Sequence, residues 1–288
     1  MSYRRIANCL VLATATVCLS NIPQAIAWGD NGHEIVCTIA MKEVSPTTRS
    51  RVEQLMQQLG TSADYASSCT FPDHPRQRAE EHFVNLSRDA AGITNDLCPE
   101  GDICLVSAIP ADFAVLRRAD ADDAAKLDAI RFLGHWVGDI HQPLHVSFED
   151  DRGGNSVRVT GVCSANLHGT WDNCLVSKAV GDDVVAAADV LDAEVTAEDR
   201  ADWATFNVVG WANESFAITT GFPTHYCTVA GDVCEYEPGN PTLDPGEPKR
   251  VVEIDTAYVD AAKPMVRLRL KQAGVRLAHL LDEAFQDQ

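Results

Sequence analysis

Histidine and aspartate side chains between residues 133 and 145 have the types and the spacing of metal ligands. The segment reads LGHWVGDIHQPLH and holds three of the nine histidines in this 288-residue chain. On a helix, His135 and Asp139 are four residues apart and therefore lie on one face. His168 and Asp172 repeat this spacing in the segment NLHGTWD. Imidazole nitrogens and carboxylate oxygens without thiolates suit zinc, which carries out no redox chemistry.

The helix that carries His135 and Asp139 is expected to be buried, because apolar residues cover much of its remaining circumference. These apolar residues are Phe132, Leu133, Trp136, Val137 and Ile140. A buried carboxylate without a partner is costly, so Asp139 requires a cation or a strong hydrogen-bond donor. Pro143 ends the helix, and His145 follows two residues later. A lone His–x3–Asp pair is more often a pair on a solvated helix face, so residues elsewhere must decide between the two interpretations.

Helical periodicity dominates the chain and predicts an all-α protein in which helices position these side chains. The predicted helices are 30–44, 46–60, 107–118, 122–142, 179–195, 198–221 and 257–285. Ser45 is a suitable N-cap for the second helix, and Pro46 suits its first position. A strand pair or hairpin is expected near 156–160, and the Pro/Gly-rich residues 237–248 predict a surface loop. With no internal repeat or dividing linker, residues 28–288 are expected to form a single domain.

Residues 1–27 have the features of a cleaved signal peptide. Two arginines precede an apolar run over 6–19, and small residues form an A-x-A pattern at 25–27. A membrane anchor is the alternative, but the run is short for a span and is followed by proline and glutamine. Cleavage after Ala27 would make Trp28 the first residue, with a free α-amino group, and would place the protein in the periplasm or the medium.

Eight cysteines remain after removal of the leader, and an even number in an exported chain predicts disulfides rather than thiolate metal sites. Spacing alone does not establish the connectivity. Short loops favour Cys98–Cys104, Cys163–Cys174 and Cys227–Cys234, which leaves Cys37–Cys69 as a fourth bridge. The alternative is that some of these cysteines stay free.

The formal net charge is −19, and it becomes −21 when the leader and its two arginines are removed. A surface of this charge would repel a polyanion at long range, which argues against nucleic acid as a partner. A buried cluster of divalent cations can reverse the potential locally. The charge therefore bears on solubility and does not decide the substrate.

Seven motifs occur in one order along the chain. They are W-x4-H at 28–33, D-x2-R at 73–76, H-F-V-N at 82–85, H-x3-D-x2-Q-P-L-H at 135–145, D-R-G-G-N at 151–155, N-L-H-x3-D at 166–172 and W-A-N-E-S at 211–215. Together they resemble the S1/P1 nuclease family, zinc-dependent exported phosphoesterases that share a helical fold with bacterial zinc phospholipase C. The resemblance extends over residues 28–288 and implies the phospholipase C/P1 nuclease fold.

The resemblance also implies three zinc ions per chain. The implied ligands are Asp73, His82, His135 and Asp139 for the first ion, Trp28, His33 and Asp139 for the second, and His145, His168 and Asp172 for the third. Trp28 would contribute its amino nitrogen and its carbonyl oxygen. Asp139 would bridge two ions, which would explain a carboxylate on a buried helix.

The family's reaction, carried over to this chain, is hydrolysis of single-stranded DNA and RNA to 5′-phosphate products, together with dephosphorylation of 3′-mononucleotides. By resemblance, Asp73 orients or deprotonates the attacking water and Arg76 binds the phosphate. Phe83 would stack on a base, while Asn85 and Asn155 would contact base edges. Many fungal members carry aspartate at the position of Asn85, and plant-like members carry asparagine, so the base preference stays open.

Two other functions compete with this interpretation. A zinc phospholipase C would, by resemblance, have a longer interval after the N-terminal tryptophan and a glutamate at the position of Asp172. A zinc-storage protein would have no use for Asp73 and Arg76. We expect a monomer without a membrane anchor after signal cleavage. Four further histidines are expected to be structural or solvated, namely His74, His141, His225 and His279.

Overall fold

The computed structural model describes residues 28–59, 64–95, 98–99, 101, 103–221, 228–230, 233–235 and 251–286. The predicted signal peptide, the loop at 237–248 and His225 lie outside these residues, as does Cys227 of one predicted bridge. Those predictions are therefore not tested by the structure.

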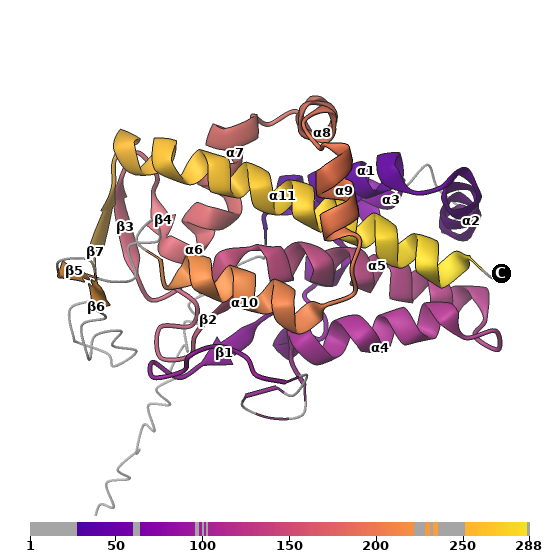
Figure 1. The fold of residues 1–288 in the computed structure, drawn as a ribbon, viewed down its shortest axis with the longest axis horizontal. Coiled ribbons are helices and arrows are strands. Elements are labelled where there is room, and N and C mark those ends of the chain that lie inside the picture. The colour runs from indigo at the N-terminus through magenta and orange to yellow at the C-terminus, as the bar shows by residue number, and fades with distance from the viewer. Residues whose placement is uncertain are drawn as a thin grey trace, which may run out of the picture.

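The described chain is mainly helical, as predicted (Figure 1). The α-helices are α1 Asp30–Glu43, α2 Pro46–Gln57, α3 Tyr65–Ser68, α4 Leu105–Arg117, α5 Asp123–His141, α6 Leu167–Gly169, α7 Leu175–Val180, α8 Val184–Ala193, α9 Ala197–Trp203, α10 Val208–Thr219 and α11 Thr256–Phe285. Three 3₁₀ turns and one π-helical turn join them: η1 Phe71–Asp73, η2 Ala79–His82, η3 Pro143–His145 and η4 Thr170–Cys174.

The strands are short and lie in three small sheets. They are β1 Val84–Leu86, β2 Val146–Phe148, β3 Arg158–Gly161, β4 Ala165–Asn166, β5 Thr228–Ala230, β6 Val233–Glu235 and β7 Val251–Ile254. β1 and β2 pair in parallel, β3 pairs with β4 and β7, and β5 pairs with β6. The predicted strand near 156–160 is confirmed as β3, which is antiparallel to β4. The parallel β1–β2 pair joins residues that are 62 positions apart, such as Val84 and Val146, and was not predicted, because three residues are too few to show an alternating pattern.

Two predicted helices are each divided in the structure. The segment 179–195 forms the end of α7 and then α8, with Gly181 between them at a φ of 83°. The segment 198–221 forms α9 and α10, and the Asn207 side chain caps α10 by accepting a hydrogen bond from the Gly210 N–H. Gly181, with its positive φ, ends α7, and the Asn207 cap begins α10 as a separate helix. The prediction of continuous helices was wrong at these two points.

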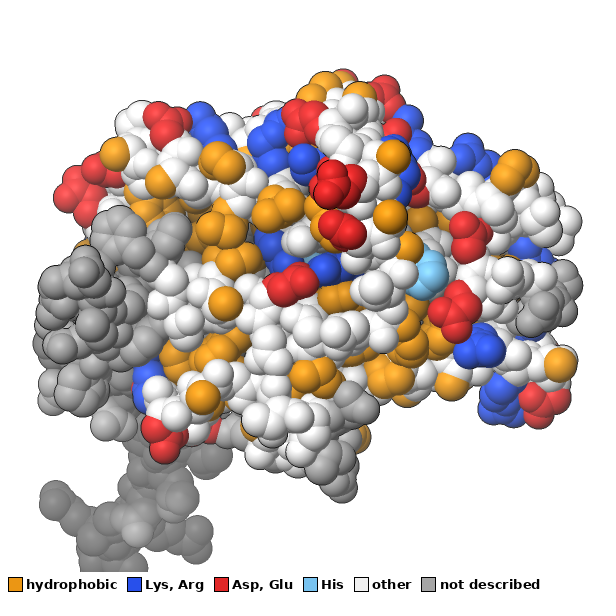
Figure 2. All heavy atoms as spheres, viewed as in Figure 1, with side chains coloured by type: hydrophobic (Ala, Val, Ile, Leu, Met, Phe, Trp, Pro, Cys, Tyr) orange, Lys and Arg blue, Asp and Glu red, His pale blue; other side chains and the backbone are white. Residues whose placement is uncertain are grey.

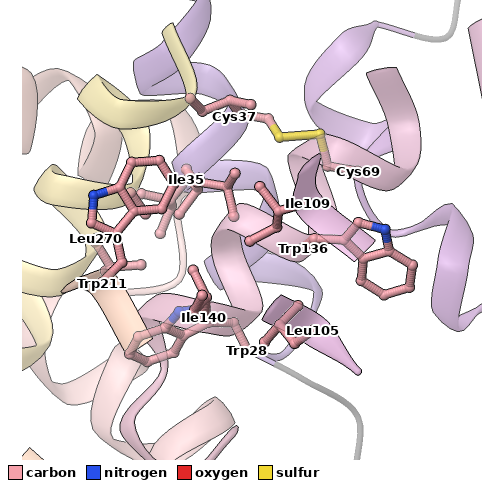
Figure 3. Close-up of a cluster of buried hydrophobic side chains, with 14 of the residues drawn as sticks. Trp28, Ile35, Cys37, Cys69, Leu105, Ile109, Trp136, Ile140, Trp211 and Leu270 are labelled. Carbon is pink, nitrogen blue, oxygen red and sulfur yellow. A yellow bond between two sulfur atoms is a disulfide. The ribbon is translucent and has the colours of Figure 1, made fainter. Parts of the chain in front are cut away.

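The longest helix, α11, crosses the molecule and packs against α1, α5 and α7 (Figure 1). Between these helices lies the core, in which Trp28, Ile35, Trp136 and Leu270 are fully buried (Figure 3). Every residue of α5 from 132 to 141 is buried, as the sequence predicted. A fully buried large apolar side chain contributes about 1.5–3 kcal/mol, so α5 is held firmly in place.

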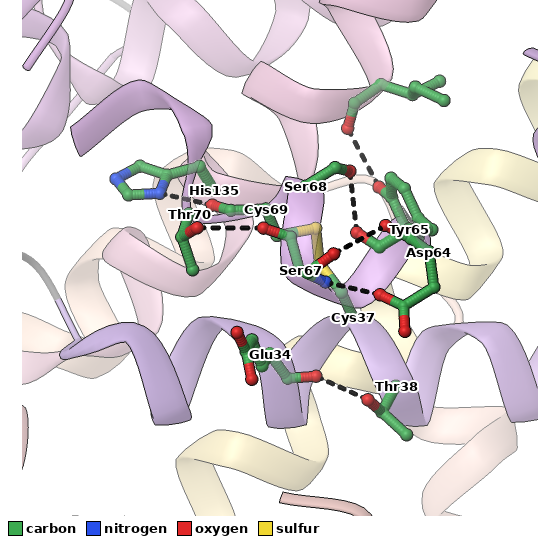
Figure 4. The surroundings of a disulfide bond; sticks show 11 residues. Glu34, Cys37, Thr38, Asp64, Tyr65, Ser67, Ser68, Cys69, Thr70 and His135 are labelled. Carbon is green, nitrogen blue, oxygen red and sulfur yellow. Dashed lines mark hydrogen bonds between the residues drawn. A yellow bond between two sulfur atoms is a disulfide. The ribbon is translucent and has the colours of Figure 1, made fainter. Parts of the chain in front are cut away.

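Three of the predicted disulfides are present: Cys37–Cys69, Cys98–Cys104 and Cys163–Cys174. The first ties α1 to the residue that follows α3 (Figure 4). The Cys69 carbonyl oxygen accepts a hydrogen bond from His135 Nδ1 at 2.7 Å (Figure 4). This bridge therefore fixes the backbone that orients one of the predicted metal ligands.

Acidic and basic side chains are interspersed with hydrophobic ones over the face of the molecule formed by α9, α10 and α11 (Figure 2). No continuous basic surface is visible among the described residues on this face. None of the described helices is both long enough and apolar enough to cross a membrane.

Candidate metal centre

Three groups of buried histidine and aspartate side chains lie around the C-terminal half of α5. The groups are His33, His135 and Asp139; Asp73, His82 and His135; and His145, His168 and Asp172. Within each group, one potential ligand atom from every residue lies within 4.8 Å of the others. The structure thus brings together all eight predicted histidine and aspartate ligands, although they come from α1, α5, α6 and the four η turns.

Asp139 lies between the first two groups and is completely buried. Its Oδ1 atom is 3.3 Å from His33 Nε2, while its Oδ2 atom is 3.3 Å from His82 Nδ1 and 3.4 Å from His135 Nε2. The two carboxylate oxygens therefore face different histidines. This is the arrangement that a bridging ligand requires.

Asp73, in η1, also lies close to His82 and His135. Its Oδ1 is 3.6 Å from His82 Nδ1, and its Oδ2 is 3.6 Å from His135 Nε2. No carboxylate oxygen of Asp73 or Asp139 has a hydrogen-bond partner among the described residues. Two ligands of one tetrahedral zinc ion, each about 2.0–2.2 Å from the metal, lie about 3.3–3.6 Å apart. The buried oxygens and nitrogens fit a shared cation better than they fit direct hydrogen bonds.

The third group also brings imidazole nitrogens and a carboxylate oxygen close together. His168 Nε2 lies 3.1 Å from His145 Nε2 and 3.6 Å from Asp172 Oδ2. The other carboxylate oxygen of Asp172 accepts a hydrogen bond from Gln142 Nε2 at 2.5 Å. Asp172 Oδ2 has no hydrogen-bond partner among the described residues and faces the two imidazoles.

Four of the five histidines each direct one ring nitrogen to a backbone carbonyl oxygen. The pairs are His82 Nε2 with Gln77 O (2.9 Å), His135 Nδ1 with Cys69 O (2.7 Å), His168 Nδ1 with Gly153 O (2.6 Å) and His145 Nδ1 with His82 O. Because a carbonyl oxygen only accepts, the nitrogen facing it carries the proton, and the second nitrogen is left as a lone-pair donor. Outer hydrogen bonds of this kind orient histidine ligands in metal sites.

His33 is the exception, since neither ring nitrogen has a hydrogen-bond partner within the described part of the chain. Its ring stacks on that of His135 with centroids 3.8 Å apart. Gly138 makes room for it, because a Cβ atom at that position would lie 2.6 Å from His33 Nδ1. A side chain on α5 at this point would displace the imidazole from the group.

Burial sets the protonation of these side chains. It lowers the pKa of the His33 and His82 imidazoles to about 3 and that of His168 to about 4, so they are neutral near neutral pH. Burial also raises the pKa of Asp73 to about 6, and the charge of Arg76 opposes this rise. The pKa of Asp139 is raised well above its usual value for the same reason. Neutral imidazoles are ready ligands, and a bound cation would offset the cost of burying charged carboxylates.

The predicted substrate-contacting residues meet around one cavity of about 250 Å³. Its lining includes Arg76, Phe83, Asn85, Asn155, His145 and His168. The cavity therefore opens beside the third group. Asn155 already donates from Nδ2 to the Arg152 carbonyl oxygen at 2.8 Å, and its Oδ1 accepts from Asn166 at 3.3 Å. The Asn155 amide is thus held in one orientation at the cavity wall.

Trp28 lies next to these groups, and its side chain is fully buried. The following residue anchors it, since the Gly29 N–H donates to the Asp172 carbonyl oxygen at 2.9 Å. On its other side, the position of a Cβ atom at Gly138 is 3.7 Å from the Trp28 ring. Residue 27 lies outside the described chain, so the structure does not test the role of the Trp28 amino group.

Gln142 has a place in the site that sequence reasoning missed. The side chain is fully buried and its amide contacts both Asp172 and the backbone at Leu144. It stands in the Q-P-L-H segment, where a polar residue beside a buried helix end could have indicated such a role. By contrast, His141 donates to the Val137 carbonyl oxygen and faces Arg276, and the exposed His74 faces Asp30. These two histidines are structural or solvated, as predicted.

Comparison with known proteins identifies the family of the chain. The sequence profile of the family described as S1/P1 Nuclease matches residues 28–286. The chain is 30% identical to Endonuclease 2 of Arabidopsis thaliana, covering 91% of this chain and 92% of that protein. It is 27% identical to Nuclease S1 of Aspergillus oryzae (95% and 96%) and 26% identical to Nuclease P1 of Penicillium citrinum (89% and 97%). The chain belongs to the S1/P1 nuclease family.

Proposed function

We propose that the protein is an exported zinc-dependent nuclease that hydrolyses single-stranded DNA and RNA to 5′-phosphate products and also dephosphorylates 3′-mononucleotides. One observation carries the proposal: a cavity lined by a guanidinium group and an aromatic ring opens directly beside a buried His/Asp group. The relatives named above are an endonuclease and two nucleases.

The three groups would hold three zinc ions. The proposed ligands are Asp73, His82, His135 and Asp139; Trp28, His33 and Asp139; and His145, His168 and Asp172. When bound, zinc lowers the pKa of a coordinated water toward neutrality and stabilises negative charge on phosphate oxygens. The unpartnered buried oxygens of Asp73 and Asp139, and the lone-pair nitrogens that face them, support this assignment.

Two side chains act on the phosphate and the water. Asp73 lies 3.6 Å from His82, and its carboxylate orients the attacking water and accepts its proton. Arg76 lines the cavity and donates hydrogen bonds to the phosphate oxygens, whose negative charge grows in the transition state. Cleavage of the bond between phosphorus and the 3′-oxygen leaves a 3′-hydroxyl on one product and a 5′-phosphate on the other.

The residues that line the cavity support the proposed preference for single-stranded nucleic acid. Phe83 is half-buried there and offers a ring on which any base can stack. Asn85 and Asn155 line the same cavity and can contact the edge of the stacked base. A base must leave its helix to reach this ring, which costs unpairing energy in a duplex and little in a single strand.

We also propose that the chain is exported to the periplasm or the medium as a single-domain monomer, residues 28–288, after cleavage following Ala27. Three disulfides support an oxidising compartment. The buried position of Trp28 beside the metal-ligand groups supports cleavage at this point.

The N-terminus provides one prediction. A protein with a single alanine retained before Trp28 should hold about two zinc ions instead of three, because its α-amino group is no longer available as a ligand. Zinc would be measured by elemental analysis against the protein cleaved after Ala27. Full zinc content in the extended protein would show that the amino group is not a ligand.

Phe83→Ala should raise the KM for single-stranded DNA about tenfold, because stacking contributes about 1–3 kcal/mol per base. Zinc content should stay unchanged, since the ring is not among the proposed ligands. Phe83→Tyr keeps the stacking surface and serves as the matched control. Steady-state kinetics on oligothymidylate would test this, and equal KM values for the alanine and tyrosine variants would contradict it.

The function itself is tested with matched single- and double-stranded DNA of one sequence. We expect cleavage of the single strand at least about tenfold faster, with 5′-phosphate ends on the products. A third reaction with phosphatidylcholine vesicles tests for a phospholipase C. Equal rates on both DNA forms, products with 3′-phosphates, or release of phosphocholine would each overturn the proposal.

A further inference from the structure

We propose that Arg152 binds a phosphate flanking the scissile one and thereby favours polynucleotides over substrates with a single phosphodiester. The inference rests on the proposed nuclease function. Arg152 belongs to the D-R-G-G-N segment, but neither the motif nor the proposed reaction gives this side chain a role.

Arg152 lines the cavity that contains Arg76 and Phe83 and opens beside His168. It is exposed, and its guanidinium group makes no hydrogen bond or ion pair with the described residues. Such a free cation is unusual here, because acidic side chains pair with most other described arginines, for example Arg78 and Arg88. An unpaired guanidinium group in a cavity of a strongly acidic protein fits an anionic ligand.

The backbone holds Arg152 in a fixed position relative to the third metal group. Arg152, Gly153 and Gly154 have consecutive positive φ angles of 57°, 63° and 80°. A non-glycine residue in this region is disfavoured, and it persists where the surroundings determine the conformation. Asp151, which is buried, accepts hydrogen bonds from Gly154 N–H and from Arg88 and so supports this turn.

The same turn orients a proposed zinc ligand. The Gly153 carbonyl oxygen accepts a hydrogen bond from His168 Nδ1 at 2.6 Å. A Cβ atom on Gly153 would lie 2.6 Å from the Leu144 carbonyl oxygen and 3.3 Å from His168 Nδ1, so the backbone reaches this distance only as glycine. The Arg152 side chain is therefore attached to the rigid turn that positions His168.

Arg76 and Arg152 differ in their relation to the metal groups. Arg76 is half-buried and follows the proposed ligand Asp73 by three residues. Arg152 is exposed and lines the same cavity. The half-buried Arg76 is therefore placed for the reacting phosphate, and the exposed Arg152 on the same cavity is placed for the next phosphate of a strand.

The test compares thymidylyl-thymidine, which has one phosphodiester, with oligothymidylate, which has several. The measured quantity is the ratio of kcat/KM for the longer substrate to kcat/KM for the shorter one. Arg152→Ala and Arg152→Gln should each lower this ratio about tenfold, because each removes charge-assisted hydrogen bonds to the flanking phosphate. The negative slope of log kcat/KM against log salt on oligothymidylate should become shallower by about 0.7.

Arg158→Ala is the matched control, because Arg158 is also exposed and loses the same charge but does not line the cavity. It should leave the ratio unchanged. A ratio that is unchanged in both Arg152 variants, or lowered equally by Arg158→Ala, would overturn the inference while the nuclease function stands. A wild-type protein that cleaves neither substrate would refute the proposed function and this inference with it. Zinc content and thermal unfolding of each variant would show that the turn is intact.

Discussion

Asp139→Asn is expected to lower the zinc content from three ions to one and the nuclease activity at least about a thousandfold. The two carboxylate oxygens of Asp139 face His33 on one side and His82 with His135 on the other. Asparagine has the same size but is neutral, and it offers one acceptor oxygen in place of two. Both groups that share Asp139 should therefore lose affinity together.

His168→Ala provides the matched comparison for this loss. His168 belongs only to the third group, so its removal should release one ion and leave the other two bound. Elemental analysis and native mass spectrometry of both variants would count the ions. Loss of a single ion from each variant would show that Asp139 is not shared.

Arg76→Ala is expected to lower kcat by about 10²–10³, because it removes the donor placed to stabilise the charge that grows on the phosphate. Zinc content should not fall. Arg76 is a cation close to Asp73 and Asp139, so its removal takes away a charge that repels metal ions. Arg76→Lys keeps the positive charge but cannot make bidentate hydrogen bonds to the phosphate, and it should recover only part of the rate.

Single-turnover kinetics with saturating enzyme would separate the chemical step from binding in the Arg76 variants. A normal rate constant in Arg76→Ala would exclude a role in the transition state. A loss of zinc in proportion to the loss of rate would instead assign Arg76 to the stability of the cluster.

Local patterns in the sequence were sufficient for much of the fold and for the two His–x3–Asp pairs. The buried face of α5 appeared as an apolar circumference around His135 and Asp139, and the structure confirms it. The Ser45–Pro46 start of α2 and the short disulfide loops were equally local. Such features depend on residues within a few positions of one another, which is the range over which periodicity and capping act.

The resemblance to known motifs, rather than spacing, connected ligands from separate segments. Periodicity placed His135 and Asp139 on one face, but no local rule relates them to His33 or Asp73. The breaks in the predicted helices 179–195 and 198–221 were also not predicted, because helical periodicity continues across Gly181 and Asn207. Gly181 follows the end of α7 and Asn207 caps the start of α10, but the apolar spacing on either side of them is compatible with one continuous helix.

The sequence by itself determined which side chains could bind zinc and which helix buries them. Only the tertiary structure decided which oxygen of Asp139 faces which histidine, which ring nitrogen of each histidine is bound to a carbonyl oxygen, and that Gln142 supports Asp172. It also decided that the turn holding His168 carries Arg152 into the cavity. These are contacts between segments that meet only when the core packs, and their geometry is set by the packed backbone, which leaves no periodic pattern in the chain.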